Sequence, residues 1–125
     1  MDIEAIDNET MPKALGPYSQ VIRAGDLLFV SGQAGIDPDT EALPTGGFEA
    51  EARQAFLNLR RALTAAGSGP DRVVKTTVFL GAAEFFPTMN ALYAETFPTR
   101  PPARSTPIVA LPRGLRISID AIAAR

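Results

Sequence analysis

The chain has no histidine, no cysteine and no tryptophan in its 125 residues. Without histidine it lacks the usual general base at neutral pH, the commonest zinc ligand and any Ser-His-Asp arrangement. Without cysteine it can form neither a disulfide nor a thiol nucleophile, and its redox compartment is left undetermined. Any chemistry must therefore use carboxylates, hydroxyls, arginine, lysine, backbone groups and water.

Excess charge and long apolar runs are also missing. The formal net charge of −2 and the sequence pI of about 5.1 give no electrostatic reason to bind nucleic acid or an anionic membrane. No apolar run approaches the length of a membrane span, and residues 1–11 lack the basic and apolar regions of a signal peptide. We therefore expect a cytoplasmic protein with no nucleic-acid partner and no membrane partner.

The composition that is present is ordinary for a globular domain, with 46% hydrophobic and 21% charged residues. A chain of 13.3 kDa can bury roughly two-thirds of the surface that it exposes when unfolded. We expect residues 1–125 to form a single domain, with residues 1–12 as a flexible acidic N-terminus.

The first half of the chain predicts two strands and a helix. Residues 18–23 and 26–31 form a hairpin pattern joined at Ala24-Gly25, and residues 27–30 are apolar on both faces. Between residues 48 and 66, apolar side chains recur at three- and four-residue steps, with Glu51 off that stripe. Gly67 is the expected end of this helix, because glycine takes positive φ at little cost.

The second half predicts three strands and one helix. Residues 72–80 are β-branched and apolar on both faces, which is typical of a central strand. Residues 84–97 predict a helix with Pro87 in its first turn, where the missing N–H costs little. Residues 106–111 predict a strand that Pro107 places at an edge or a bulge, and residues 115–123 alternate cleanly between two faces.

The predicted order is β-β-(β)-α-β-α-β-β, in which the optional third strand precedes the first helix. Two helices can cover only one face of such a sheet, yet several strands are apolar on both faces. Since no segment of the chain is left to cover the second face, we expect another copy of the same protein there, in a closed symmetric oligomer.

Arg104 is the candidate binding residue. It follows Pro98, Pro101 and Pro102, which leave the preceding segment few conformations. A guanidinium on a rigid, extended arm is pre-organised to hold a carboxylate through two parallel hydrogen bonds. The alternative is an arginine that pairs with a surface acid after a proline-rich linker.

Six motifs occur in order between about residue 14 and the C-terminus. They are Gly16-Pro17-Tyr18-Ser19-Gln20, Val30-Ser31-Gly32-Gln33, the strand at 71–80, Asn90-Ala91-Leu92-Tyr93, Pro102-Ala103-Arg104-Ser105 and the strand at 117–123. In this order and spacing, the chain resembles the Rid family of reactive intermediate deaminases, also called the YjgF family.

The resemblance implies a chorismate-mutase-like α+β fold, with two helices packed on one face of a mixed sheet. It also implies a homotrimer with its sites between neighbouring subunits, a small substrate or ligand that carries a carboxylate, and no cofactor. Family members with the arginine hydrolyse 2-imino acids and enamines, such as 2-iminopropanoate and 2-aminoacrylate, to 2-oxo acids and ammonia.

The resemblance also implies roles for single residues. Arg104 would hold the substrate carboxylate as a bidentate ion pair and so orient the imine carbon for attack. Tyr18 would line the pocket with its hydroxyl available for a hydrogen bond; the alternative is a tyrosine that caps the edge of the core. Ser31 would offer a hydroxyl or a backbone amide where Gly32 allows close approach; the alternative is a turn serine.

Two further residues are candidates on the same ground. Asn90 lies on the second predicted helix, where it would face the pocket; the alternative is an exposed or locally bonded asparagine. Thr106 matches a position that lines the family pocket, where we expect no more than a supporting contact.

Ser118 departs from the family pattern. Deaminating members have a glutamate here that holds the attacking water, whereas a serine hydroxyl can orient water but cannot act as a base near neutral pH. Asp120 points to the same face two residues further, roughly 7 Å along the strand, and we interpret it as structural. Carboxylate binding is therefore better supported than efficient hydrolysis.

Three hypotheses of function follow. The first is a cofactor-independent imine or enamine deaminase, with Arg104 and Ser118 as its catalytic residues. The second is a non-catalytic trimeric protein that binds small carboxylates and regulates or protects a partner, and Ser118 favours it. The third, an RNA-cleaving translation inhibitor, has little support from a chain with no histidine, a net charge of −2 and two lysines.

Overall fold

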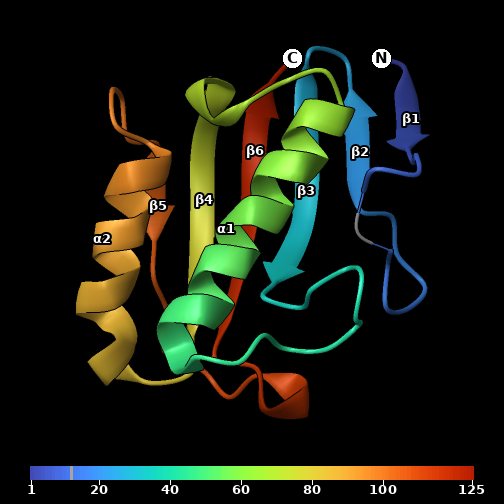
Figure 1. Cartoon of the computed structure of the whole chain (residues 1–125). Coiled ribbons are helices and arrows are strands. Elements are labelled where there is room, and N and C mark those ends of the chain that lie inside the picture. The colour runs from blue at the N-terminus through green and yellow to red at the C-terminus, as the bar shows by residue number, and fades with distance from the viewer. Residues whose placement is uncertain (12) are drawn as a thin grey trace.

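The computed structural model describes residues 1–11 and 13–125 of the chain (Figure 1). Within these residues lie two α-helices, α1 (Gly47–Ala65) and α2 (Phe86–Thr96). The strands among them are β1 (Ile3–Ile6), β2 (Val21–Ala24), β3 (Leu27–Ala34), β4 (Val73–Leu80), β5 (Ala103–Ser105) and β6 (Ile117–Ala124).

These strands form one sheet in the order β1-β2-β3-β6-β4-β5. β4 and β5 are parallel, and the other neighbours are antiparallel. Both helices lie across the same face of this sheet (Figure 1). The predicted α+β architecture, with two helices on one face of a mixed sheet, is therefore confirmed. No helix within residues 1–11 and 13–125 is long and apolar enough to span a membrane.

The core lies between the helices and the sheet. Every second residue of β6 is buried, starting with Ile117 and Ile119, and Val78 of β4 is buried beside them. α1 contributes Leu59 and Leu63 from its apolar stripe. Burying an aliphatic side chain of this size stabilises the fold by about 1.5–3 kcal/mol. The two periodicities in the sequence therefore identify the central strands and α1 correctly.

The sheet face away from the helices is apolar but uncovered in the single chain. Leu27 and Phe29, which alternate with buried residues of β3, are 40% and 41% exposed. Phe29 pairs with half-buried Ile122 of β6, and Phe79 of β4 is also half-buried. We call Leu27, Phe29, Phe79 and Ile122 the open sheet face.

The additional strand of this fold precedes the predicted hairpin at the N-terminus, and its expected place between that hairpin and the first helix is wrong. β1 pairs with β2, from Ile3 opposite Ala24 to Ile6 opposite Val21. Between β3 and α1 there is instead an isolated bridge, Asp37 with Ala42. Part of the segment expected to be flexible is thus a strand, while residue 12 lies outside the described residues. Most of β1 is exposed, so apolar patterning carries no signal of its pairing.

The strand predicted at residues 106–111 is also wrong in position. The strand is β5, which pairs in parallel with β4 and places Arg104 beside Thr76. After β5, the Leu80 N–H donates to the Pro107 carbonyl at 3.0 Å, and the Val109 N–H donates to the Leu80 carbonyl at 2.9 Å. Pro107 supplies a carbonyl but has no N–H, so regular pairing cannot continue through it.

Glu51 is fully buried, although the sequence pattern places it off the apolar stripe. Its Oε1 accepts a hydrogen bond from Arg116 Nε at 2.7 Å, and its Oε2 accepts one from the Arg116 backbone N–H at 2.8 Å. Gly35 packs so closely on the Glu51 backbone that a Cβ at position 35 would overlap it. This ion pair ties α1 to the start of β6.

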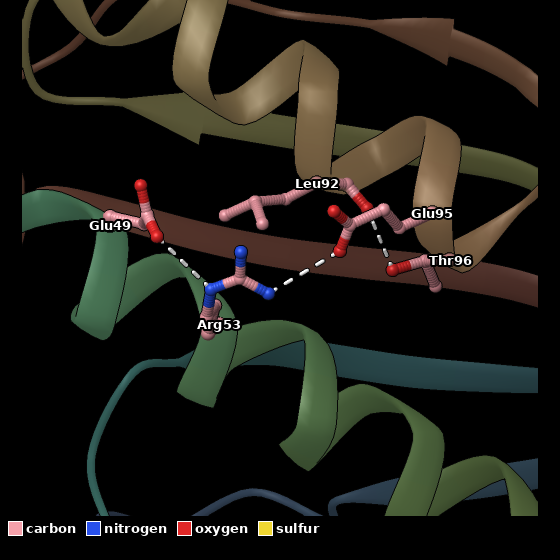
Figure 2. Close-up of polar contacts among 5 residues, drawn as sticks. All are labelled: Glu49, Arg53, Leu92, Glu95 and Thr96. Atoms are coloured by element: carbon pink, nitrogen blue, oxygen red, sulfur yellow. Dashed lines mark hydrogen bonds and ion pairs between the residues drawn. The ribbon is translucent and has the colours of Figure 1, made fainter.

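On the outer side of the helices, Arg53 connects α1 to α2. Its Nε lies 3.3 Å from a carboxylate oxygen of Glu49, and its Nη1 lies 3.3 Å from one of Glu95 (Figure 2). All three side chains are more than half exposed, so each pair contributes about 1 kcal/mol or less. Apolar packing therefore matters more than these pairs for holding the helices together.

We predict that Glu51→Ala lowers the free energy of unfolding by about 3 kcal/mol, because it leaves the guanidinium and the backbone N–H of Arg116 without their acceptor. Glu49→Ala is the matched control on the same helix, and it should cost less than about 1 kcal/mol. Urea unfolding followed by circular dichroism measures both changes. Equal losses in the two variants would contradict a special role for the buried pair.

Candidate functional site

A cavity of about 660 Å³ lies beside the irregularity in the β3–β6 pairing between Val30 and Gln33. Tyr18, Gly32, Gln33, Arg113 and Ser118 are among the residues that line it. We call it the β3–β6 cavity. Two of the residues singled out from the sequence, Tyr18 and Ser118, therefore share one space.

Ser118 lies directly against Gly32. A Cβ at position 32 would stand 2.6 Å from Ser118 Oγ, which is too close for two non-bonded atoms. No hydrogen bond connects the Ser118 hydroxyl to any of the described residues, and this side chain lines the cavity. Gly32 therefore makes room for a side chain at 118, and the hydroxyl is available to a water or a ligand.

Tyr18 is 44% exposed, and its hydroxyl accepts a hydrogen bond from the Leu15 N–H at 3.1 Å. The phenol proton remains available to a ligand. Ser31 does not line the cavity; its hydroxyl donates to the Ser19 carbonyl at 2.6 Å. Gln33 Nε2 donates to Gln20 Oε1 at 2.7 Å. These two bonds tie the segment that carries Tyr18 to β3.

Asp120 is half-buried and lies on the same face of β6 as Ser118. Its Oδ1 accepts a hydrogen bond from the Thr77 N–H at 3.1 Å. One carboxylate oxygen is thus engaged by β4, which agrees with a structural interpretation of this acid.

Arg104 is half-buried, and its guanidinium lies against one face of α2. Its Nη1 donates to Asn90 Oδ1 at 2.8 Å and lies 3.8 Å from Met89 Sδ. Its Cζ lies 4.7 Å from the centre of the Tyr93 ring and 5.5 Å from that of Phe86. We call Phe86, Met89, Asn90 and Tyr93 the Arg104 cage. Arg104 and Asn90, which are both candidate site residues from the sequence, are therefore brought together.

Sequence reasoning missed the other three members of this cage. Their positions, with Asn90, follow the three- and four-residue steps of one helix face, and that spacing was the available signal. Met89 and Tyr93 are both buried. What the pattern did not show is that their inner face meets a cation.

Within one chain, the Arg104 cage and the β3–β6 cavity are separate. Arg104 pairs with Thr76, whereas Ser118 pairs with Phe79, on the opposite side of β4. Two strand spacings of about 4.8 Å and three residues of about 3.3 Å each separate these positions. Arg104 and Asn90 are not among the residues that line the cavity. A ligand held by Arg104 therefore cannot reach Ser118 of the same chain.

Thr106 and Arg113 complete the set of candidates. Thr106 is half-buried just beyond β5, where it lines neither of the two described cavities. Arg113 lines the β3–β6 cavity and has a left-handed backbone, with φ of 60°. Arg113 could not be recognised from the sequence, because a Pro-Arg-Gly turn has the composition of an ordinary surface loop.

A second cavity of about 260 Å³ lies between α1 and α2, beside the Arg53–Glu95 pair in Figure 2. None of the residues predicted for the site lines it. Among residues 1–11 and 13–125, no three acidic side chains gather closely enough to hold a metal ion.

Comparisons with known proteins place this geometry in context. The family described as endoribonuclease L-PSP matches residues 8–125. A 2-iminobutanoate/2-iminopropanoate deaminase from Mus musculus is 43% identical over 121 residues, which cover 96% of this chain and 90% of the mouse protein.

Solved structures show the same fold. A protein of the conserved Rid family from Yersinia pestis, YyfA, superposes with a TM-score of 0.94 at 38% identity, over 99% of this chain and all of that one. TdcF from E. coli with bound serine gives a TM-score of 0.90 at 32% identity, over 98% of both chains.

Proposed function

Because the chain belongs to the Rid family, whose members are also described as endoribonuclease L-PSP, we propose that it hydrolyses small 2-imino acids to 2-oxo acids and ammonia at a site built by two copies of the chain. The named relatives support an imine deaminase in general. The choice of small imino acids, such as 2-iminopropanoate, and the shared site are our proposal.

The open edge of the Arg104 guanidinium is the observation that carries this proposal. Asn90 engages Nη1. Among the described residues, no acceptor contacts Nε or Nη2, which lie side by side on one edge of the group. Two parallel N–H donors on such an edge match a carboxylate. Serine, the ligand in the TdcF structure, is itself a small carboxylate.

A second copy of the chain supplies the reaction space. The open sheet face offers an apolar surface for this contact, as expected for strands that need cover on both sides. In the proposed arrangement, Arg104 and Asn90 of one copy face the β3–β6 cavity of its neighbour. The ligand's carboxylate then lies on Arg104 and its imine carbon near Tyr18 and Ser118.

The reaction needs little activation, since a protonated imine is already electrophilic. Water adds to its carbon to form a C–O bond, and the C=N pair of electrons moves to nitrogen. A proton of the added water passes to this nitrogen through solvent. The C–N bond then breaks, the second proton leaves the oxygen, and the products are the 2-oxo acid and ammonium. Arg104 orients the carbon by holding the neighbouring carboxylate, a contribution of the kind worth several kcal/mol. The Ser118 hydroxyl can orient the water but cannot accept its proton at neutral pH.

A second candidate function is carboxylate binding without efficient turnover. Ser118 favours it, because serine stands where the resemblance implies a water-holding glutamate. Cleavage of RNA, which the family description suggests, remains poorly supported by a chain without histidine and with a net charge of −2. The direct test is ammonia release from 2-iminopropanoate generated in situ.

We predict that Arg104→Ala abolishes binding of pyruvate, 2-oxobutyrate and benzoate while the fold stays intact. Arg104→Lys should also lose most of the affinity, because an ammonium group cannot form the two parallel bonds. Isothermal calorimetry measures the affinities, with circular dichroism as the check on folding. Equal affinity in wild type and Arg104→Ala would show that the carboxylate lies elsewhere.

Subunit mixing tests the shared site. Arg104→Ala keeps the cavity, and Ser118→Phe blocks the part of the cavity beside position 118 but keeps Arg104. When equal amounts are refolded together, about a quarter of the interfaces in a closed ring combine an intact Arg104 with an intact cavity, so benzoate binding and ammonia release should return. No recovery would indicate a site within one chain.

Light scattering should give a trimer of about three times 13.3 kDa.

We predict that wild type deaminates 2-iminopropanoate slowly and that Ser118→Glu raises the rate, since positioned acid–base assistance is worth on the order of 100-fold. Ser118 lines the β3–β6 cavity, which offers room for the longer side chain. Asp120→Asn is the control and should matter little. A wild type as fast as glutamate-bearing relatives, with Asp120→Asn unimpaired, would show that neither acid is needed.

A further inference from the structure

Tyr93 is a buried residue whose ring contacts the guanidinium of Arg104. It is 5% exposed, and its ring face lies 4.7 Å from Arg104 Cζ, closer than the ring of Phe86 at 5.5 Å. A guanidinium at this distance is attracted to the negative face of an aromatic ring. Phe97 packs against the same ring with a centroid separation of 4.7 Å, and Phe56 meets it edge-on at 6.1 Å. The ring is therefore fixed by its neighbours.

The hydroxyl of Tyr93 is fixed as well. It shares a hydrogen bond of 2.6 Å with Thr76 Oγ1, and both groups are buried. Thr76 is the residue of β4 that pairs directly with Arg104 of β5. The contacts therefore close a loop: Arg104 pairs with Thr76 through the backbone, Thr76 holds Tyr93, and the Tyr93 ring lies over the guanidinium of Arg104.

We propose that Tyr93, held by Thr76, is a positioning residue that sets the orientation of Arg104 for carboxylate binding. The inference rests on the proposed function, because it concerns the same carboxylate. An arginine side chain has many rotamers, and holding a ligand in one of them costs conformational entropy. A guanidinium already stacked on a fixed ring, with Asn90 engaging Nη1, loses less of that freedom when a ligand binds.

The protonation of Tyr93 agrees with this role. Burial raises the pKa of Tyr93 above its ordinary value, although the hydrogen bond to Thr76 and the charge of Arg104 act in the opposite direction. The phenol therefore stays neutral around neutral pH. A neutral ring attracts the guanidinium without forming an ion pair that would compete with the carboxylate of a ligand.

The experiment compares three substitutions on the intact chain. Tyr93→Leu removes the ring face and should weaken benzoate binding roughly two- to thirty-fold, the range that corresponds to a cation–π contact. Tyr93→Phe keeps the ring face and should restore most of that affinity. Leu92→Ala is the matched control: Leu92 is buried on the same helix, and it is not among the described residues that form a hydrogen bond or a cation–π contact with Arg104. It should cost stability without a change in affinity.

Two further measurements separate positioning from general packing. In wild type, the Arg104 Nε–H proton should show an upfield ring-current shift by nuclear magnetic resonance, and Tyr93→Leu should abolish it while Leu92→Ala retains it. In turnover, Tyr93→Leu should raise KM for the imine more than it lowers kcat. Thr76→Val removes the hydroxyl partner and should give a smaller loss of the same kind, which provides a test if Tyr93→Leu does not fold.

The outcomes are distinguishable. Wild-type affinity in Tyr93→Leu, or an equal loss in Leu92→Ala, overturns the positioning role while the proposed function stands, provided that Arg104→Ala still abolishes binding. If Arg104→Ala binds benzoate normally, the proposed site fails and the positioning role fails with it. A ring-current shift and an affinity loss that depend on the Tyr93 ring alone support the inference.

Discussion

The buried ion pair between Glu51 and Arg116 is the contact on which the arrangement of the sheet depends. It joins α1 to the backbone at the start of β6, the strand that lies between β3 and β4. Once this end of β6 is fixed, the alternation along the strand directs Ile117 and Ile119 to the core and Ser118 to the cavity. Glu51 is fully buried whereas the Arg116 side chain is 36% exposed, so the main cost of breaking the pair is a buried carboxylate without its partner.

Much of this fold follows from the sequence, because its central elements have one strongly apolar face. The stripe in α1 and the alternation in β6 each predict an element within one or two residues of its ends. The predictions fail where pairing uses backbone groups alone. β1 has exposed side chains, and β5 is a three-residue strand between prolines, so neither carries an apolar pattern. The burial of Glu51 was not predicted for a related reason, since a charged residue is expected at the surface until its partner is known.

The residues of the candidate site could be predicted from the sequence, but their positions relative to one another could not. Arg104, Asn90, Tyr18 and Ser118 could be named from motifs, since each lies in a short stretch with a recognisable order. Their grouping into two separate places could not, because it depends on which strands are neighbours in the sheet. The Arg104 cage could not be predicted from the sequence of α2 alone. A helix face with two aromatic rings and a methionine looks like core, and only the position of β5 shows that a cation faces it.

The short strand that carries Arg104 also affects which molecules the protein can distinguish. β5 is hydrogen-bonded to β4 and lies between Pro102 and Pro107, so the position of the Arg104 Cα in the fold is fixed. In the proposed function, this position sets the distance from the bound carboxylate to the place in the neighbouring copy's cavity where water attacks. A 2-imino acid has these two groups on adjacent atoms, whereas a 3- or 4-imino acid places its reactive carbon one or two bonds further away. The rigid strand then selects by the position of the imine along the chain of the substrate, independently of its side chain.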